Sequence, residues 1–185
     1  AAYGDLDESQ LREKPAGRKP VKTTTASVDR LHDAVAGVQR QLDAGGKVFW
    51  VCPLVEESET IDVAAATARH AALREQFGER VGLVHGKMPG KEKDAVMARF
   101  ADGVAPEIDL LVATTVIEVG VDVPEATVMV IEHAERFGLA QLHQLRGRIG
   151  RGDRDATCLL LYGHETGQTG RERLRVLRDT DDGFE

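Results

Sequence analysis

The sequence predicts an α/β fold in which a doubly wound, mainly parallel sheet carries helices on both of its faces. Short apolar runs of strand length alternate along the chain with longer segments of helical length. The runs are apolar at nearly every position, as in strands that are buried on both faces. With 185 residues and 42% hydrophobic content, the chain can bury one such core. We therefore expect a single domain with short appendages.

The elements are expected in a simple order. Residues 1–26 are interpreted as an interdomain linker, because their prolines and glycines prevent a long helix. Ser27 is a plausible N-cap for a first amphipathic helix, which the pair Gly45-Gly46 ends. The later segments are a strand over 47–54, a helix over 58–77, a strand over 81–85, a helix over 89–100, strands over 109–114 and 127–132, a helix over 138–148 and a strand over 156–162.

The domain itself is expected to span residues 27–165. Residues 166–185 form a charged, arginine-rich tail in which Leu174 and Leu177 fall on one side of a helix. This spacing predicts a C-terminal helical arm that packs against the domain.

The composition excludes several classes of protein. A net charge of -7 is unlike that of a protein that coats nucleic acid with its whole surface, although it allows a local groove that binds phosphates. Both cysteines lie in apolar runs, which is typical of reduced core residues and indicates a cytoplasmic setting. No apolar run approaches the roughly 18 residues of a membrane span, so no membrane association is expected. The six histidines show no metal-ligand spacing, and no metal site is expected.

Two arginines set among glycines give the strongest functional signal, in the segment QLHQLRGRIGRG at residues 141–152. Because glycine costs roughly 1 kcal/mol relative to alanine within a helix, the three glycines indicate that a helix ends here. Arg148 and Arg151 are then expected on its last turn, three residues apart and pointing the same way. Two forked, permanently charged donors suit a polyphosphate held between this surface and another. The simpler alternative is a solvated basic helix end.

Further polar residues follow the predicted strands, where the ligand site of a parallel α/β sheet lies. The segments at these carboxyl ends read CPLVEESE, HGKMPG and TTVIEVGVDVP, and LRGRIGRG is expected near the fifth strand. The amides around Gly86 precede a helix and suit a phosphate, and the hydroxyl of Thr114 suits a nucleic-acid phosphate. Gly120 and Asp122 open a turn whose carboxylate suits a ribose hydroxyl or a bridging water. Ordinary turn chemistry is the alternative at all four positions.

A nucleotide-binding loop is missing from the sequence. The motif GxxxxGK[ST] does not occur, so the chain is not expected to cradle a nucleoside triphosphate alone. It holds the arginine half of a phosphate-transfer site without the phosphate-cradling or magnesium half. We therefore expect the substrate to lie between this domain and a sister domain.

Four segments together resemble a known family. VFWVCPLVEES, VGLVHGKM, LLVATTVIEVGVDVP and FGLAQLHQLRGRIGRG are similar, in order and spacing, to motifs IV to VI of superfamily 2 helicases. The wording is nearest to the RecG family of branch-migrating DNA helicases, along essentially the whole chain. The transcription-repair coupling translocases share FGLAQLHQLRGR and are the nearest alternative, but VCPLVEESE and the tail LRDTDDGF resemble RecG. A non-catalytic α/β interaction module that kept the fold and lost its motor is the alternative from another class.

The resemblance implies a second RecA-like motor domain of a helicase that acts on branched or forked DNA. ATP and Mg²⁺ would be held mainly by a first RecA-like domain, which lies upstream in the same polypeptide together with a wedge domain. The helicase is expected to act as a monomer. The tail, residues 166–185, would be the truncated first arm of a translocation hairpin.

The resemblance also implies roles for single residues. Arg151 would be the arginine finger on the γ-phosphate, with Arg148 beside it. The remaining assignments are Gln144 to the nucleotide-sensing motif, Gly120 and Asp122 to the nucleotide, Gly86 and Thr114 to the DNA backbone, and Arg173 to the coupling of ATP hydrolysis to movement.

Overall fold

The computed structural model describes residues 21–53, 59–114, 123, 126–150, 155–163 and 168–179, except for the side chains of 168–171 and 173. The strands are β1 (Val21–Ser27), β2 (Lys47–Val51), β3 (Val81–Val84), β4 (Leu110–Ala113), β5 (Ala126–Ile131) and β6 (Ala156–Tyr162). The helices are α1 (Leu31–Asp43), α2 (Glu59–Phe77), α3 (Gly90–Ala101), α4 (Leu139–Arg146) and α5 (Gln168–Asp179), with short 3-10 helices η2 (Val28–Arg30), η3 (Gly78–Arg80) and η4 (Ala134–Arg136).

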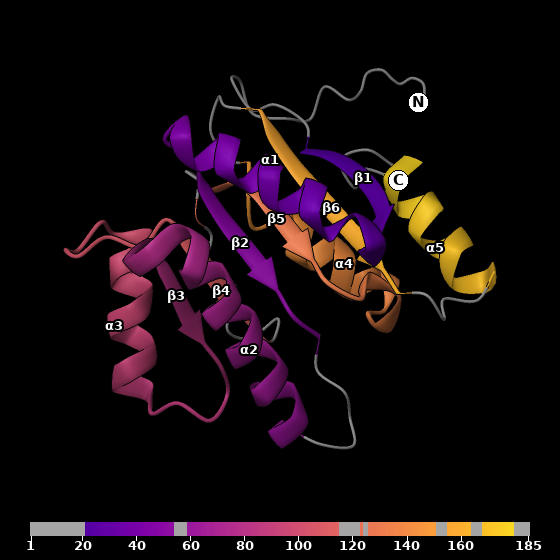
Figure 1. The fold of residues 1–185 in the computed structure, drawn as a ribbon. Helices are drawn as coiled ribbons and strands as arrows, with labels where there is room; N and C mark the ends of the chain where they lie inside the picture. The colour runs from indigo at the N-terminus through magenta and orange to yellow at the C-terminus, as the bar shows by residue number, and fades with distance from the viewer. Residues whose placement is uncertain are drawn as a thin grey trace.

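The six strands form one sheet in the order β1-β6-β5-β2-β4-β3 (Figure 1). Every neighbouring pair is parallel, so the sheet formed by the described residues is parallel throughout. β2 lies inside the sheet, and all five of its residues are buried. Parallel neighbours need crossover connections, which the helices supply. The predicted doubly wound α/β fold is confirmed.

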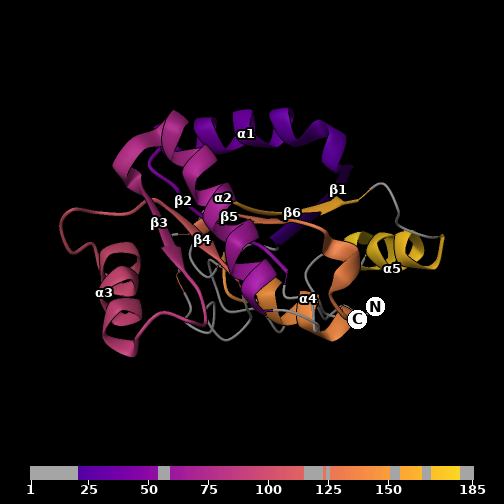
Figure 2. The same ribbon diagram turned by 60° about the horizontal axis from the view of Figure 1, so that its bottom comes forward.

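Helices cover both faces of the sheet (Figure 2). α1 and α2 pack on one face, where Val38, Leu73 and Trp50 belong to one apolar cluster. α3, α4 and α5 pack on the other face, whose cluster contains Phe49 and Phe100. The rings of Phe49 and Phe100 meet edge to face with their centroids 5.0 Å apart. Adjacent residues of β2 therefore serve opposite layers, as the alternation of side chains along a strand requires.

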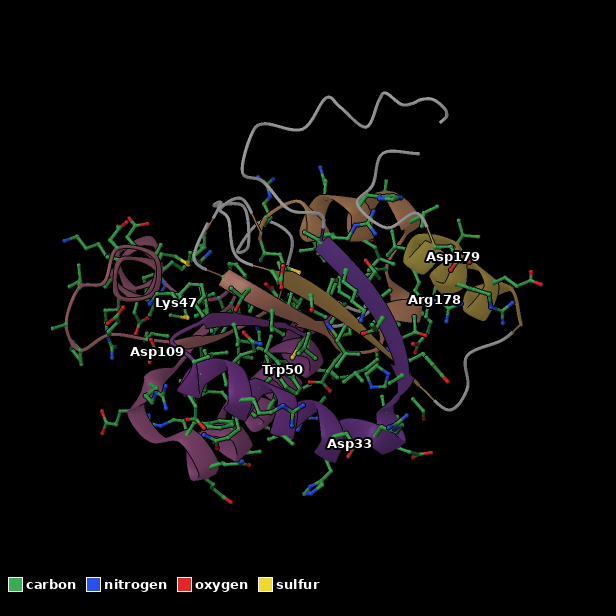
Figure 3. The ribbon with its side chains drawn as sticks, turned by 90° about the horizontal axis from the view of Figure 1, so that it is seen from above. Asp33, Lys47, Trp50, Asp109, Arg178 and Asp179 are labelled. Carbon is green, nitrogen blue, oxygen red and sulfur yellow. The ribbon has the colours of Figure 1, made fainter. Side chains whose placement is uncertain are left out.

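Ion pairs close the edge of the sheet at which β2, β3 and β4 begin. Lys47 and Asp109 lie close together there (Figure 3). The ammonium of Lys47 lies 2.8 Å from Glu107 Oε2 and 3.6 Å from Asp109 Oδ1. Arg80 Nε donates to the other oxygen of Asp109 at 3.1 Å. Lys47 and Arg80 are paired with these carboxylates, so their role is structural. They hold the starts of β2, β3 and β4 together.

The edge strand β1 differs from the prediction. Residues 21–26 fall within the expected linker, but they form a strand that pairs with β6 from Val21↔Ala156 to Ser27↔Tyr162. The strand reads VKTTTAS and is rich in β-branched threonine, which favours extended backbone. The prolines that indicate a linker lie before it. The domain therefore includes residues 21–26, and residues 1–20 lie outside the described part of the chain.

The first and last helices, α1 and α5, lie where the sequence predicts them. Ser27 Oγ accepts the N–H of Asp29 at 3.1 Å, so Ser27 caps η2, and α1 follows. At the other end, α5 buries Leu174 and Leu177 in the core as predicted. None of the helices within the described ranges is long and apolar enough to cross a membrane.

Candidate nucleotide and nucleic-acid sites

The turn after β3 presents Gly86 to solvent. It lies at the end of the sheet where the strands finish, which we call the carboxyl edge. The end where the strands begin is called the amino edge. Gly86 and Lys87 are exposed, and the N–H of Lys87 donates to His85 Nδ1 at 3.2 Å. The ammonium of Lys87 donates to Thr60 Oγ1 at 3.1 Å, which ties the turn to the start of α2. The predicted phosphate position at Gly86 is therefore accessible.

Thr114 follows β4 at the same edge, but its side chain is buried. The residue is 1% exposed, and within the described part of the chain its Oγ1 has no hydrogen-bond partner. A buried hydroxyl without a partner costs about 1 to 3 kcal/mol and calls for a ligand or a neighbouring group that completes it. The N–H of Cys52 donates to the carbonyl of Ala113 at 2.8 Å, so the end of β2 lies beside Thr114.

The described end of the arginine segment, residues 147–150, lies at the amino edge, where it was not expected. The N–H of Gly150 donates to the carbonyl of Ala126, the first residue of β5, at 3.3 Å. A helix that follows one parallel strand and leads to the next must return along the sheet, so its end lies at the amino edge. The expectation that this segment lies near the carboxyl end of the fifth strand is therefore wrong. α4 also ends at Arg146, with Gly147 as its C-cap, so Arg148 lies beyond the last turn.

Arg148 is joined at the amino edge to the residue that follows Asp122. Its carbonyl accepts the N–H of Val123 at 3.2 Å, so the main chain connects two of the segments that the sequence assigns to the nucleotide. Gln144 is exposed on α4. Gly120, Asp122 and Arg151 lie outside the described residues, and Arg173 lies on α5 with a side chain that the structure does not describe.

Arg146 is a buried arginine that was not predicted from the sequence as a site residue. It is 2% exposed, and its Nη1 donates to Thr23 Oγ1 at 2.9 Å and to the carbonyl of Leu177 at 3.0 Å. Its Nη2 lies 3.0 Å from His143 Nδ1. Burial, and then the charge of Arg146, lowers the pKa of His143 and favours the neutral ring that accepts this bond. Arg146 thus joins β1, α4 and α5. Its spacing from the buried Leu142 is the signal that could have predicted its burial.

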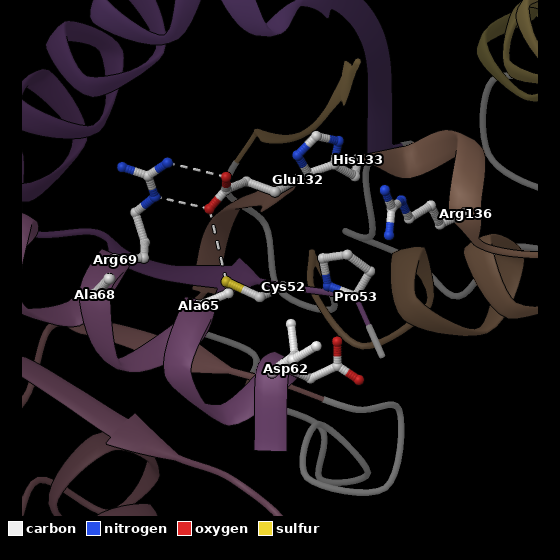
Figure 4. A pocket seen from close by; sticks show the side chains of 10 residues that line it. Cys52, Pro53, Asp62, Ala65, Ala68, Arg69, Glu132, His133 and Arg136 are labelled. Atoms are coloured by element: carbon white, nitrogen blue, oxygen red, sulfur yellow. Dashed lines mark hydrogen bonds and ion pairs between the residues drawn. The ribbon is translucent and has the colours of Figure 1, made fainter. Parts of the chain in front are cut away.

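A pocket of about 410 Å³ opens at the carboxyl edge between the end of β2, α2 and the turn after β5 (Figure 4). Its walls include Pro53, Asp62 and Arg69, and Glu132 and Arg136 from the turn. The sequence predicts polar residues at this edge, but no pattern in it predicts the pocket. Within the described ranges, no three side chains of the metal-ligating types lie together as a metal site would need.

The buried carboxylate of Glu132 holds three elements together at this pocket. Arg69 donates to it through Nε at 2.7 Å and Nη2 at 3.0 Å, and Trp50 Nε1 donates at 2.7 Å. Burial raises the pKa of Glu132, but the bonds and charge of Arg69, with the Trp50 donor, outweigh burial and lower the pKa below its ordinary value. Burial, and then the charge of Glu132, raises the pKa of the Cys52 thiol, which lies 3.6 Å from the carboxylate. Cys52 is therefore an inert donor and not a nucleophile.

The turn after β5, residues 132–136, has an unusual backbone. His133 has φ 49° and ψ 52°, in the left-handed region that few residues other than glycine adopt. Glu135 Oε1 accepts the N–H of Gly163, which follows β6, at 3.0 Å. A Cβ on Gly163 would lie 3.0 Å from both Glu135 Oε2 and His133 Nδ1, so a larger residue there would require these side chains to shift. The only sign of this turn in the sequence is Glu132, a carboxylate that ends an otherwise apolar strand.

The fold and these segments define a domain of helicases. The family described as helicase conserved C-terminal domain matches residues 27–153, which is more than half of the chain. The chain therefore belongs to the helicase conserved C-terminal domain family.

The relatives of the chain narrow this family to one kind of helicase. The chain is 51% identical over 183 residues to the ATP-dependent DNA helicase RecG of Acidithiobacillus ferridurans, which covers 98% of this chain and 26% of the relative. A solved structure of RecG bound to a three-way DNA junction matches with a TM-score of 0.75 and 45% identity, over 92% of this chain and 22% of that one. The C-terminal domain of the DEAD-box protein Dbp5 matches with a TM-score of 0.59 over 89% of this chain and 85% of that one, but at 17% identity this shows the fold alone. The predicted RecA-like fold and the resemblance to RecG are confirmed, and the chain spans about a quarter of the length of the curated relatives.

Proposed function

We propose that this chain is the second motor domain of an ATP-dependent DNA helicase that remodels replication forks and branched DNA. The observation that carries the proposal is the 51% identity to a RecG helicase over 98% of the chain, which leaves almost no segment outside the match. The first motor domain and a wedge domain would precede this domain in the same polypeptide, and the helicase would act as a monomer in the cytoplasm. A related structure with a three-way DNA junction supports branched DNA as the substrate.

The described residues fit one side of a nucleotide site at the amino edge. Arg148 supplies a cation there, and its backbone bond to Val123 fixes its position. Because the chain lacks GxxxxGK[ST], the phosphates of ATP and Mg²⁺ would be held mainly by the first motor domain. Arg148 and Arg151 would stabilise the negative charge that develops during hydrolysis. The other proposed nucleotide contacts are Gly120, Asp122 and Gln144.

The DNA backbone would lie along the carboxyl edge. Gly86 and Thr114 follow neighbouring strands, since β3 and β4 pair at Val84↔Ala113. Amide and hydroxyl donors bind phosphates without reading the bases, which suits a motor that acts on any sequence. The nucleotide and the DNA would thus contact opposite ends of the same strands.

Replacement of Arg151 in the complete helicase tests the nucleotide assignment. We expect Arg151→Ala to lower the turnover number for ATP by on the order of 10³ or more, because the guanidinium acts chiefly where charge develops in the transition state. The Kd for ATP should change little. Arg151→Lys should not restore turnover, because an ammonium lacks the planar fork of donors. Turnover and the Kd for ATP are measured separately in the presence of forked DNA.

Arg40→Ala is the control for the loss of one positive charge. Arg40 is exposed on α1, on the opposite face of the sheet from α4, so its removal should alter neither quantity. Equal losses of turnover and ATP affinity in Arg151→Ala would show that the arginine binds the ground state and is not a finger. A parent protein without DNA-stimulated ATPase activity would favour the non-catalytic interaction module.

A further inference from the structure

Arg136 places a positive charge at the pocket on the carboxyl edge (Figure 4). It ends η4 and is exposed, and in the part of the chain that the structure describes its guanidinium makes no hydrogen bond or ion pair. The two carboxylates of the same turn are engaged elsewhere, because Glu132 binds Arg69 and Glu135 accepts from Gly163. The charge of Arg136 is therefore available to an external anion.

The turn that carries Arg136 is fixed from three directions. Glu132 ties its start to α2 and β2, and Glu135 ties its middle to the end of β6. Between them, the left-handed backbone of His133 sets the direction of η4. A conformation of this kind costs on the order of 1 kcal/mol and persists where the surrounding structure over-determines it, which is typical of ligand sites. The backbone at Arg136 is thus preorganised, although its guanidinium forms no hydrogen bond or ion pair with the described residues.

The charge inside the pocket does not oppose an anion at its mouth. Glu132 is neutralised by two bonds from Arg69. Asp62 also lines the pocket, but it is 3% exposed, whereas Arg136 is exposed to solvent. An anion that approaches from outside therefore meets the guanidinium before it meets either carboxylate.

Arg136 is in line with the two proposed DNA contacts. Gly86 follows β3, Thr114 follows β4 and Arg136 lies in the turn after β5, with β2 between β4 and β5. Neighbouring strands lie about 4.8 Å apart, so Thr114 and the start of the turn are separated by about 10 Å along the edge. One strand of a DNA duplex carries a phosphate about every 3.4 Å along the axis, so about three nucleotides span this distance. A DNA strand on Gly86 and Thr114 would reach Arg136 within a few nucleotides.

We propose that Arg136 is a DNA-backbone contact whose guanidinium fork binds one phosphodiester and extends the DNA-binding edge to the turn after β5. The inference rests on the proposed function, since the line of contacts begins at Gly86 and Thr114. An acidic segment of another domain is the competing partner. The position of Arg136 at the strand ends, in line with Thr114, favours the phosphodiester.

The test measures binding of forked DNA to the complete helicase over a series of salt concentrations, without nucleotide. Arg136→Ala should weaken binding about tenfold at fixed salt, equally for two unrelated sequences, because one charged hydrogen bond to phosphate is lost. The slope of log K against log salt should fall in magnitude by about 1, because one fewer counterion is released. Arg136→Lys keeps the charge and should keep the slope, and the exposed control Arg40→Ala should match the parent.

Two results would overturn the contact while leaving the proposed function intact. One is an affinity and slope for Arg136→Ala equal to those of the parent. The other is a loss of affinity with an unchanged salt slope, which would assign Arg136 to an ion pair with another domain. A parent helicase that does not bind forked DNA would overturn the proposed function itself, so the two failures are distinguished by the parent alone.

Discussion

At the scale of single residues, Glu132 joins parts of the chain that are far apart in sequence. Its carboxylate accepts from Arg69 in α2 and from Trp50 in β2. Replacing a whole buried ion pair with apolar residues is often neutral, whereas removing one partner leaves an uncompensated charge. The Glu132–Arg69 pair therefore serves chiefly to fix the position of the turn after β5, and it adds little net stability.

We expect Glu132→Gln to destabilise the isolated chain by about 3 kcal/mol at neutral pH, because Arg69 loses its counter-charge. The folded pKa of Glu132 lies below the ordinary 4.5, so its ionised form contributes stability in full above that value. This contribution is lost as the pH falls below 4.5 and through the folded pKa. The free energy of unfolding, from urea titrations at a series of acidic pH values, should thus fall less steeply in the variant than in the parent. Parallel acid limbs would contradict this expectation, and Arg69→Met with Glu132→Gln should recover part of the loss.

Two glycines with nearly the same positive φ allow strain and crowding to be separated. Gly150 has φ +71°, and a Cβ there would lie 2.9 Å from both Val21 Cγ2 and Ala156 Cβ. Gly78 has φ +72°, and a Cβ would meet nothing within 4 Å. We expect Gly78→Ala to cost about 1 kcal/mol from the left-handed backbone alone, and Gly150→Ala to cost about 2 kcal/mol more from overpacking. Equal changes in the free energy of unfolding would show that the neighbours of Gly150 yield freely.

At the scale of elements, local pattern was sufficient where a strand is buried on both faces. β2, β4 and β5 lie inside the sheet, and their apolar runs were predicted. β1 lies at the sheet edge, where an exposed Lys22 and several threonines leave no apolar run. Its strand state depends on pairing with β6, which is remote in sequence, so local propensity could not establish it.

Local sequence pattern also predicted the candidate site only in part. The residue types of the arginine segment and of the turn at Gly86 were evident from sequence, but their placement at opposite edges was not. That placement follows from the path of α4 back along the sheet, which is a property of the topology. Arg146 and Arg148 look alike in the sequence LRGR, yet Arg146 is 2% exposed and bonded to Thr23, whereas Arg148 lies outside the helix.

A hydrogen bond joins the arginine segment directly to α5, which is the helix of the predicted arm. Arg146, within that segment, donates to the carbonyl of Leu177, and Leu174 is anchored in the core. We expect Arg173→Ala in the complete helicase to keep DNA-stimulated ATPase activity and to lose unwinding of forked DNA, because the proposed role of Arg173 is to couple hydrolysis to movement. Arg175→Ala, at an exposed position of the same helix, is the control. Forks unwound by Arg173→Ala at the parental rate per ATP consumed would rule this role out.

At the scale of the whole molecule, the sheet separates the proposed nucleotide side from the proposed DNA side. Strands of four to seven residues lie between the two edges, which corresponds to roughly 13 to 23 Å of extended chain. The strands between them are buried and closely packed, and packed cores shift as units and do not deform continuously. A change at Arg148 would therefore reach the carboxyl edge as a movement of the domain.

The pairing of β1 with β6 also determines how the domain responds to tension. The two strands are parallel over seven residue pairs, from Val21↔Ala156 to Ser27↔Tyr162. A pull between the chain that enters β1 and the chain that leaves β6 acts on the amino end of one strand and on the carboxyl end of the other. In parallel strands these two forces are opposed along the ladder, so its hydrogen bonds are sheared together and are not opened one after another. A motor stretched between its linker and its arm would thus bear the force across a whole ladder at the edge of its sheet.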